Sequence, residues 1–173
     1  MRALSLPLIL LLATLSGCAG GAMSPEELAR SKVEAEVTLK ALHRAAAAAV
    51  ERDYFNLFAD DAVFLGTDAS ERWTKKQFQA YARPHFQKGQ GWNYRASERN
   101  VRVDPKGEYA WFDELLTNRK LGQCRGSGLL RRVEGEWKVV LYDLSIPIPN
   151  DLALEVTDKI KARETPESES KSE

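Results

Sequence analysis

The sequence contains few of the residues on which reactive sites are most often built. It has two cysteines and two histidines among 173 residues, and it shows no metal-ligand cluster, phosphate-binding glycine loop or Ser/His/Asp arrangement. We therefore expect neither a metal nor another cofactor. The 25 basic and 25 acidic residues balance, so no net charge attracts nucleic acid, and we expect no nucleic-acid partner.

The sequence also lacks an apolar run long enough for a permanent transmembrane helix. The run near the N-terminus, from Leu6 to Leu15, is too short to span a bilayer. It follows Arg2, and a short apolar run behind a basic residue is typical of a secretion signal. It ends in Leu15-Ser16-Gly17-Cys18, which resembles the lipobox of bacterial lipoproteins. The alternative is a plain secretory signal cut near Ala19 or Ala22, which leaves Cys18 unexplained.

The lipobox resemblance implies a cellular location. It makes residues 1–18 a lipoprotein signal peptide and Cys18 the lipidated first residue of the mature chain. The protein would lie on the periplasmic face of the bacterial envelope and contact the membrane through this lipid alone. Ala19 follows the cysteine in place of an aspartate, which implies the outer membrane. Cys124 would be the only remaining thiol, so we expect no intramolecular disulfide and a small core residue there; a reactive nucleophile is the alternative.

Two helix starts are well marked in the sequence. Residues 19–24 read as a short tether, after which Ser24, Pro25 and Glu27 form an N-cap, a first-turn proline and a capping box. Helical composition continues to about residue 58. We expect a break near residues 52–54, because an uninterrupted helix of that length is unusual in a compact domain. Thr74 to Gln77 is a second capping box, which predicts a helix to about residue 87.

The remaining segments predict strands. Residues 62–67 and 92–104 read as strands, and residues 108–149 read as three strands of a curved antiparallel meander joined by tight turns. Strict alternation in the last strand places Trp137, Val139, Leu141, Asp143 and Ser145 on one face. Residues 151–163 then predict a helix, and residues 164–173 lack apolar side chains, so we expect a disordered tail.

The order of these elements resembles a known family. "FADDAVFLGTDASERW", a helix, and a meander ending in "EWKVVLYDLSIPIPN" look like the SnoaL-like branch of the nuclear transport factor 2-like superfamily. The resemblance implies one SnoaL-like domain over residues 25–150. The implied fold is an α+β cone, in which a strongly curved antiparallel sheet wraps around a long N-terminal helix and leaves a pocket between them. Members include isomerases, cyclases, dehydratases and non-catalytic domains, so the fold does not choose the function.

An enzyme of this kind would need a base in its pocket. The resemblance implies a carboxylate that removes a proton beside a carbonyl, with a pKa raised by apolar walls. Asp143 is our best candidate, followed by Asp113 and Glu114. The alternative is structural, since Asp113 could form a cross-strand ion pair with Arg125. The two histidines, His43 and His85, lie in predicted helices, and we expect both at the helix surface or the core edge.

We favour a binding function over catalysis, because the last strand lacks the histidines that many catalytic relatives carry there. Aromatic rings could enclose a small, mostly apolar molecule with an acidic or carbonyl group, and an arginine could hold its carboxylate. The expected ligand-binding residues are Arg125, Trp111, Glu114, Tyr94, Trp92, Trp73 and Ser127. The alternative is that these aromatic rings only form the core. A third possibility is an assembly module of the envelope, and a homodimer is expected in that case.

Overall fold

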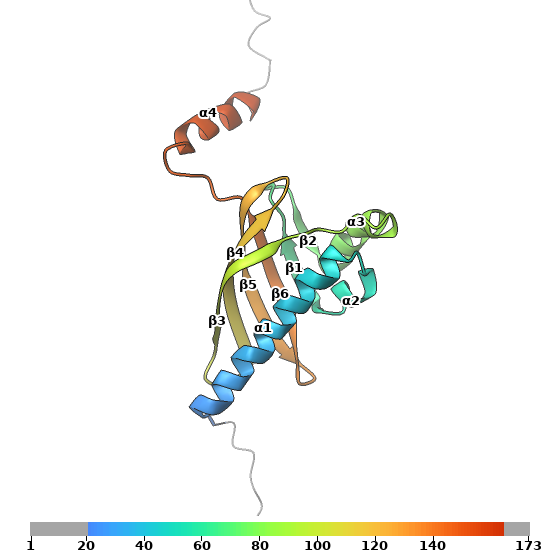
Figure 1. Cartoon of the computed structure of the whole chain (residues 1–173), viewed down its shortest axis with the longest axis vertical. Helices are drawn as coiled ribbons and strands as arrows, with labels where there is room; N and C mark the ends of the chain where they lie inside the picture. The colour runs from blue at the N-terminus through green and yellow to red at the C-terminus, as the bar shows by residue number, and fades with distance from the viewer. Residues whose placement is uncertain (1–20, 165–173) are drawn as a thin grey trace, which may run out of the picture.

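The structure, a computed structural model, describes residues 21–164, so the predicted signal peptide, Cys18 and residues 165–173 of the predicted tail lie outside the described residues. It contains one six-stranded sheet with a long helix across one face (Figure 1). The strands are β1 (Phe58–Leu65), β2 (Arg72–Thr74), β3 (Arg95–Val103), β4 (Tyr109–Asn118), β5 (Gly122–Val133) and β6 (Glu136–Ser145). They lie in the order β2-β1-β6-β5-β4-β3.

The sheet confirms the predicted α+β fold and corrects its strand pairing. All neighbouring strands pair antiparallel except β1 and β6, which run parallel. The sheet is therefore mixed, where the sequence predicted a purely antiparallel one. β1 also begins at Phe58, four residues before the predicted strand at 62–67. Because the last strand inserts beside the first, β6 lies in the middle of the sheet and lines the same cavity as β1.

The helices begin where the capping residues predict. Ser24 caps α1 (Pro25–Ala47) and Thr74 caps α3 (Lys75–Gln87), each with both hydrogen bonds of a capping box. The short helix α2 (Glu51–Phe55) follows a break at residues 48–50, slightly earlier than predicted, where Ala49 has a φ of 55°. This left-handed residue ends α1 without a glycine and turns the chain toward β1.

α1 packs on the sheet through one face. Its buried side chains are small or aliphatic, namely Ser31, Ala35, Leu39, Leu42, Ala45 and Ala46. Opposite its N-terminal half, the Trp137 indole is buried and donates to the Ser31 carbonyl at 3.1 Å. The guanidinium of Arg132 covers the Trp137 ring at 4.6 Å. Cys124 is fully buried in the core, as predicted.

A β-bulge in β6 decides which side chains face α1. Leu130 pairs with Val139, but Leu129 pairs with Leu141, so Val140 is the extra residue. The extra residue shifts the alternation by one position. Trp137 and Val139 before the bulge are buried on the same face as Tyr142 after it, and Leu141 is exposed.

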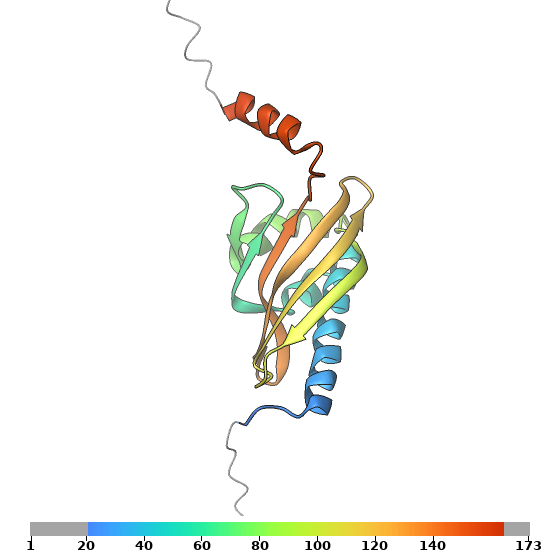
Figure 2. The same cartoon turned by 90° about the vertical axis from the view of Figure 1, so that its left-hand side faces the viewer.

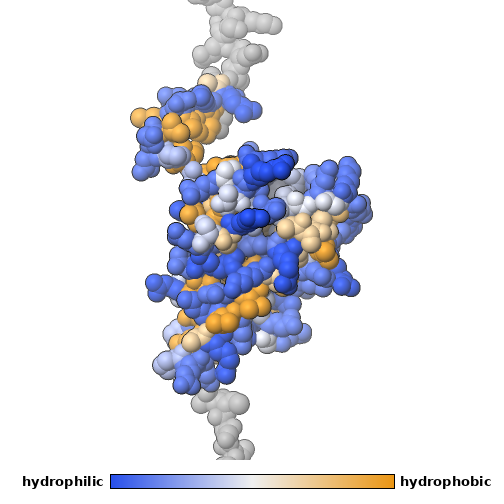
Figure 3. Space-filling view, viewed as in Figure 1, coloured by the Kyte–Doolittle hydropathy of each residue, from blue (hydrophilic) through white to orange (hydrophobic). Residues whose placement is uncertain are grey.

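The last helix stands away from this body. α4 (Ala153–Glu164) projects beyond the end of the sheet (Figure 2), and its apolar residues Leu154 and Ile160 are exposed. Apolar atoms are visible on α4 and along α1, where Val33 and Val37 are also exposed (Figure 3). Within residues 21–164, no helix is both long and apolar enough to cross a membrane.

Candidate functional site

A pocket of about 290 Å³ opens between α1, α3 and one end of the sheet. Most of its wall is aromatic or aliphatic, and a smaller number of polar groups lie at its inner wall and rim. The lining residues are Leu42, His43, Ala46, Tyr54, Phe64, Gly66, Thr67, Glu71, Trp73, Phe78, Tyr81, Trp92, Tyr94, Asn118, Lys120, Leu121, Tyr142 and Leu144. An apolar cavity with a few polar groups is the usual form of a small-molecule site.

The aromatic wall is a set of nearly parallel rings. The Trp73 and Phe78 planes differ by 5° and the Phe64 and Phe78 planes by 17°, with centroids 5.6 and 3.9 Å apart. Tyr81 lies 4.8 Å from Trp73, and its plane is within 3° of that of Trp92. Because aromatic rings attract one another in offset stacks, such a wall favours a flat guest that lies parallel to it.

Glu114 of β4 lies behind this wall and is buried, with 1% of its surface exposed. Side chains from three other elements donate to its carboxylate. His43 Nε2 of α1 lies 2.6 Å and Tyr142 Oη of β6 2.9 Å from Oε1, while Arg99 Nε of β3 lies 2.7 Å from Oε2. The carboxylate therefore connects α1 to three strands, and two of its partners, His43 and Tyr142, line the pocket.

Gly126 makes this contact possible. A Cβ at residue 126 would lie 2.4 Å from Tyr142 Oη, closer than a Cβ approaches other atoms, and would make a tight contact of 3.0 Å with Glu114 Oε1. Gly126 pairs with Glu114 on one side and Leu144 on the other, so it lies directly beneath the bonded groups. The absence of a side chain leaves the space that the Tyr142 hydroxyl and the carboxylate occupy.

The charges around Glu114 fix its protonation state. Burial alone raises its pKa, but the hydrogen bonds and charges of His43 and Arg99 lower the pKa of Glu114 below its ordinary value. Burial and the neighbouring carboxylate raise the pKa of Tyr142 well above its usual value, so its hydroxyl stays a donor. An ionised carboxylate only accepts, so Nε2 of His43 must carry the hydrogen that it shares with Glu114.

This hydrogen bond orients the other nitrogen of His43. Nδ1 has no hydrogen-bond partner among residues 21–164. The described part of the chain also leaves no fully buried side-chain nitrogen or oxygen without a partner, so Nδ1 is accessible. His43 lines the pocket with a side chain that is 14% exposed, so it is one of the few polar residues of the wall.

The other polar lining groups lie toward the opening. Burial raises the pKa of Tyr94 to about 12, so its hydroxyl is neutral. The carboxylate of Glu71 accepts from the Asp68 amide at 3.3 Å and so closes its own turn. Within the described residues, no carboxylate pairs with the ammonium of Lys120. No three His, Cys, Asp or Glu side chains in residues 21–164 are grouped closely enough to hold a metal ion.

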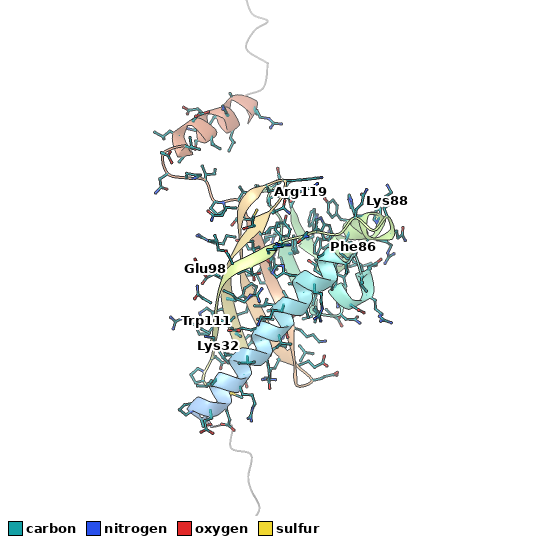
Figure 4. The ribbon with its side chains drawn as sticks, viewed as in Figure 1. Lys32, Phe86, Lys88, Glu98, Trp111 and Arg119 are labelled. Atoms are coloured by element: carbon teal, nitrogen blue, oxygen red, sulfur yellow. The ribbon has the colours of Figure 1, made fainter. Side chains whose placement is uncertain are left out.

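The structure divides the residues singled out from the sequence into two groups. Trp73, Trp92 and Tyr94 line the pocket, and Glu114 lies directly behind it. The other five lie on the opposite face of the sheet and do not line this pocket: Asp113, Asp143, Arg125, Ser127 and Trp111. Trp111 is 48% exposed and points away from the side on which α3 lies (Figure 4).

Strand alternation explains this placement. Glu114 faces inward, so its neighbour Asp113 faces outward, where it pairs with Ser127 and accepts from Asn100 at 3.1 Å. This corrects the alternative that Asp113 bonds Arg125 across the strands. Asp143 would share the face of Trp137 in a regular strand, but the bulge at Val140 turns it outward beside Ser127. The expected pocket base and the expected arginine clamp are therefore on the wrong face for this cavity.

His43 is the pocket residue that the sequence reasoning missed. It was expected at a helix surface or a core edge, because a lone histidine in a helix carries little information. Its spacing held a usable signal, since it lies four residues after Leu39 and three before Ala46, both of which are buried. A polar residue in phase with the buried face of α1 needs a buried partner, and Glu114 supplies it.

Comparison with known proteins agrees with this architecture. Residues 36–149 match the family described as "SnoaL-like domain". An NTF2-like protein of unknown function from Pseudomonas putida KT2440 aligns with a TM-score of 0.59 at 15% identity, over 71% of this chain and 91% of that one. A protein of unknown function from Mycobacterium tuberculosis aligns with a TM-score of 0.62 at 14% identity, over 76% and 81%.

A third similar structure is a candidate scytalone dehydratase from Novosphingobium aromaticivorans DSM 12444. Its TM-score is 0.59 at 12% identity, over 73% of this chain and 89% of that one. Identities this low show a shared fold and nothing of the chemistry. No curated protein matches the chain. Since the family match spans well over half of the sequence and agrees with the observed sheet and helices, this protein belongs to the SnoaL-like domain family.

Proposed function

We propose that this domain binds a small, mostly apolar, planar molecule with an acidic or carbonyl group, and that it does so without transforming it. The observation that carries the proposal is the pocket of about 290 Å³ between nearly parallel aromatic rings. Its volume is at the low end of ligand sites, which favours a guest of a few fused rings. Of the three tryptophans expected at the ligand, Trp73 and Trp92 line this pocket and Trp111 does not.

The polar group of the guest would meet the few polar side chains of the wall. His43, Tyr94 and Lys120 come from α1, the segment before β3 and the turn after β4, so they surround the cavity from different sides. These three side chains take the ligand-binding role that was expected of Arg125, which lies on the far face of the sheet. A carbonyl or carboxylate oxygen can accept from the Tyr94 hydroxyl and the Lys120 ammonium, whereas Nδ1 of a neutral His43 ring would accept from a hydroxyl of the guest.

A catalytic role for a pocket carboxylate is not favoured. Glu114 is the carboxylate nearest the inner wall, but three side chains already donate to it and its pKa is lowered. A general base needs free lone pairs and a pKa close to the working pH. Glu114 has the opposite properties, so it serves as an anchor for its donors.

Tryptophan emission can test the binding proposal, because two of the four indoles line the pocket and two do not. We would titrate the protein with 2-naphthoate and with the neutral 2-naphthalenemethanol. Both should change the emission, and Trp73→Phe and Trp92→Phe should each reduce the change. Trp111→Phe is the matched control and should leave it intact. Emission that responds to neither compound would contradict the proposal.

The location and oligomeric state are part of the proposal. The lipobox at residues 15–18 supports an envelope-anchored protein on the periplasmic face of the outer membrane, held by lipid on Cys18. Cys18→Ser should abolish metabolic labelling with palmitate; unchanged labelling would refute the anchor.

The exposed Trp111 and Leu141 on the outer face of the sheet support a homodimer through that face.

A further inference from the structure

The last helix, α4, carries an apolar stripe that is largely open to solvent. Leu152, Val156 and Ile160 recur every fourth residue, so they lie along one side of the helix and the turn before it. Leu152 and Ile160 keep 44% and 48% of their surfaces exposed. Arg163 lies on the same side, seven residues after Val156. α4 therefore presents an apolar surface that ends in a positive charge.

A short arm joins α4 to the wall of the pocket. Leu144, near the end of β6, lines the pocket, and residues 146–150 lead from that strand toward the helix. This arm contains Pro147 and Pro149, so it is stiff and spans about 15 Å when extended. A turn follows, in which the Leu152 amide donates to the Pro149 carbonyl at 3.0 Å. α4 has twelve residues and is about 18 Å long, so a change in this turn alone is enough to lay it back across the pocket.

The pocket opens toward α4. The turn between β4 and β5 and the loop between β1 and β2 lie at the end of the sheet beyond which α4 stands (Figure 1, Figure 2). Both segments line the pocket, through Lys120 and Leu121 on one side and Thr67 and Glu71 on the other. Leu121 and Tyr81, another lining residue, are 42% and 45% exposed. An apolar stripe laid across this rim would leave water together with them, which is favourable.

Charge gives α4 a direction across the rim. In both views its C-terminal end points over the loop between β1 and β2 (Figure 1, Figure 2). That end carries Arg163, and the loop carries Asp68 and Glu71, whose carboxylates accept only from groups of their own loop. None of these three side chains forms an ion pair among the described residues. Residues 151–164 hold four acidic and three basic residues, which does not suit an anionic membrane surface.

We propose that α4 is a lid, which folds back on its turn and closes the pocket with its apolar stripe over the rim and Arg163 beside the loop of Asp68 and Glu71. The structure shows the open arrangement, through which a guest can enter. Closure excludes water from the pocket and holds a guest inside. Closure itself needs no guest; only the retention of a guest rests on the proposed binding function.

A fluorescent label on the stripe tests closure in the full chain without any ligand. Contact with an indole quenches bimane emission, and Trp73 and Trp92 line the pocket. Bimane on Val156→Cys should be quenched, and replacing both pocket tryptophans by phenylalanine should restore its emission. Leu154 lies on the opposite side of α4 and is 79% exposed, so bimane on Leu154→Cys is the matched control and should stay bright. Because the two labels differ only in their position on α4, this comparison does not depend on the tryptophan variants.

A charge reversal tests the direction of the lid. Arg163→Glu should lower the ratio of closed to open protein by up to about fivefold, the range for an exposed ion pair. Glu71→Lys in that background should restore the quenching, because the two charges are then exchanged. Cys18→Ser in every variant removes one native thiol, and the other, Cys124, is buried away from the label.

Each other outcome overturns either the lid or the proposed function. A bright label on Val156→Cys would overturn the lid. Quenching that weakens on dilution, or that only Trp111→Phe relieves, would overturn it as well and assign the stripe to a second copy of the chain. A bright label together with a tryptophan response to 2-naphthoate would leave the proposed function standing without a lid. Quenching of the label with no response to either naphthalene probe would leave the lid and contradict the proposed function.

Discussion

Replacing Gly126 by alanine tests whether the space beneath Tyr142 and Glu114 holds the cluster together. The new Cβ would lie 2.4 Å from Tyr142 Oη, so the hydroxyl must move and lose its 2.9 Å bond to Glu114. Overpacking costs about 1–3 kcal/mol and a lost hydrogen bond to a charged group about 1.5–3 kcal/mol. We expect Gly126→Ala to lower the free energy of unfolding by about 3–5 kcal/mol.

The decisive comparison adds Tyr142→Phe. That change alone removes the hydroxyl and should cost about 1.5–3 kcal/mol. In the Tyr142→Phe background the added methyl group no longer meets an oxygen of that ring, so Gly126→Ala should cost only about 1 kcal/mol more, mostly from its 3.0 Å contact with Glu114. Urea unfolding of the four proteins, followed by far-ultraviolet circular dichroism, gives the coupling energy. Costs that simply add would refute the claim that the hydroxyl fills this space.

Three further predictions concern the same architecture. Trp137→Ala should cost about 3–5 kcal/mol in urea unfolding, because the indole is buried, whereas Trp111→Ala should change stability little. Because the pKa of Glu114 is lowered in the folded protein, its ionised carboxylate stabilises the fold at any pH above the ordinary pKa of 4.5, and this stability is lost as the pH falls through the folded pKa. Glu114→Gln should therefore make the free energy of unfolding less dependent on pH in acid. Urea titrations from pH 3 to 6 can check this. Leu141→Lys should abolish the proposed homodimer in light scattering and leave ligand binding unchanged; a persistent dimer would exclude this face.

Local signals allowed the helix starts to be predicted. A capping box is read within four residues, and those at Ser24 and Thr74 both form as expected. The cone itself was predicted from the family resemblance rather than from these signals. The parallel pairing of β1 with β6 joins segments far apart in the sequence, so no short pattern reveals it.

The candidate site was harder to predict because it depends on strand phase and distant partners. One extra residue at Val140 reverses the side of the sheet on which Asp143 lies, and a bulge leaves little trace in a sequence of alternating residues. The contact of His43 with Glu114 spans 71 positions. Trp73, Trp92 and Tyr94 were found because large aromatic rings near a predicted cavity have few other places to be buried.

The central position of β6 has a consequence for the order in which the protein can fold. During synthesis, α1 and β1 emerge long before the strand that joins them, and the Trp137 bond to Ser31 spans 106 positions. Contacts of such separation slow folding, since a long loop must close before they form. Until β6 is complete, β1 lacks its neighbour on that side and the apolar face of α1 lacks Trp137 and Val139. A nascent chain that ends before residue 136 is thus expected to expose this unpaired strand edge to proteases and chaperones.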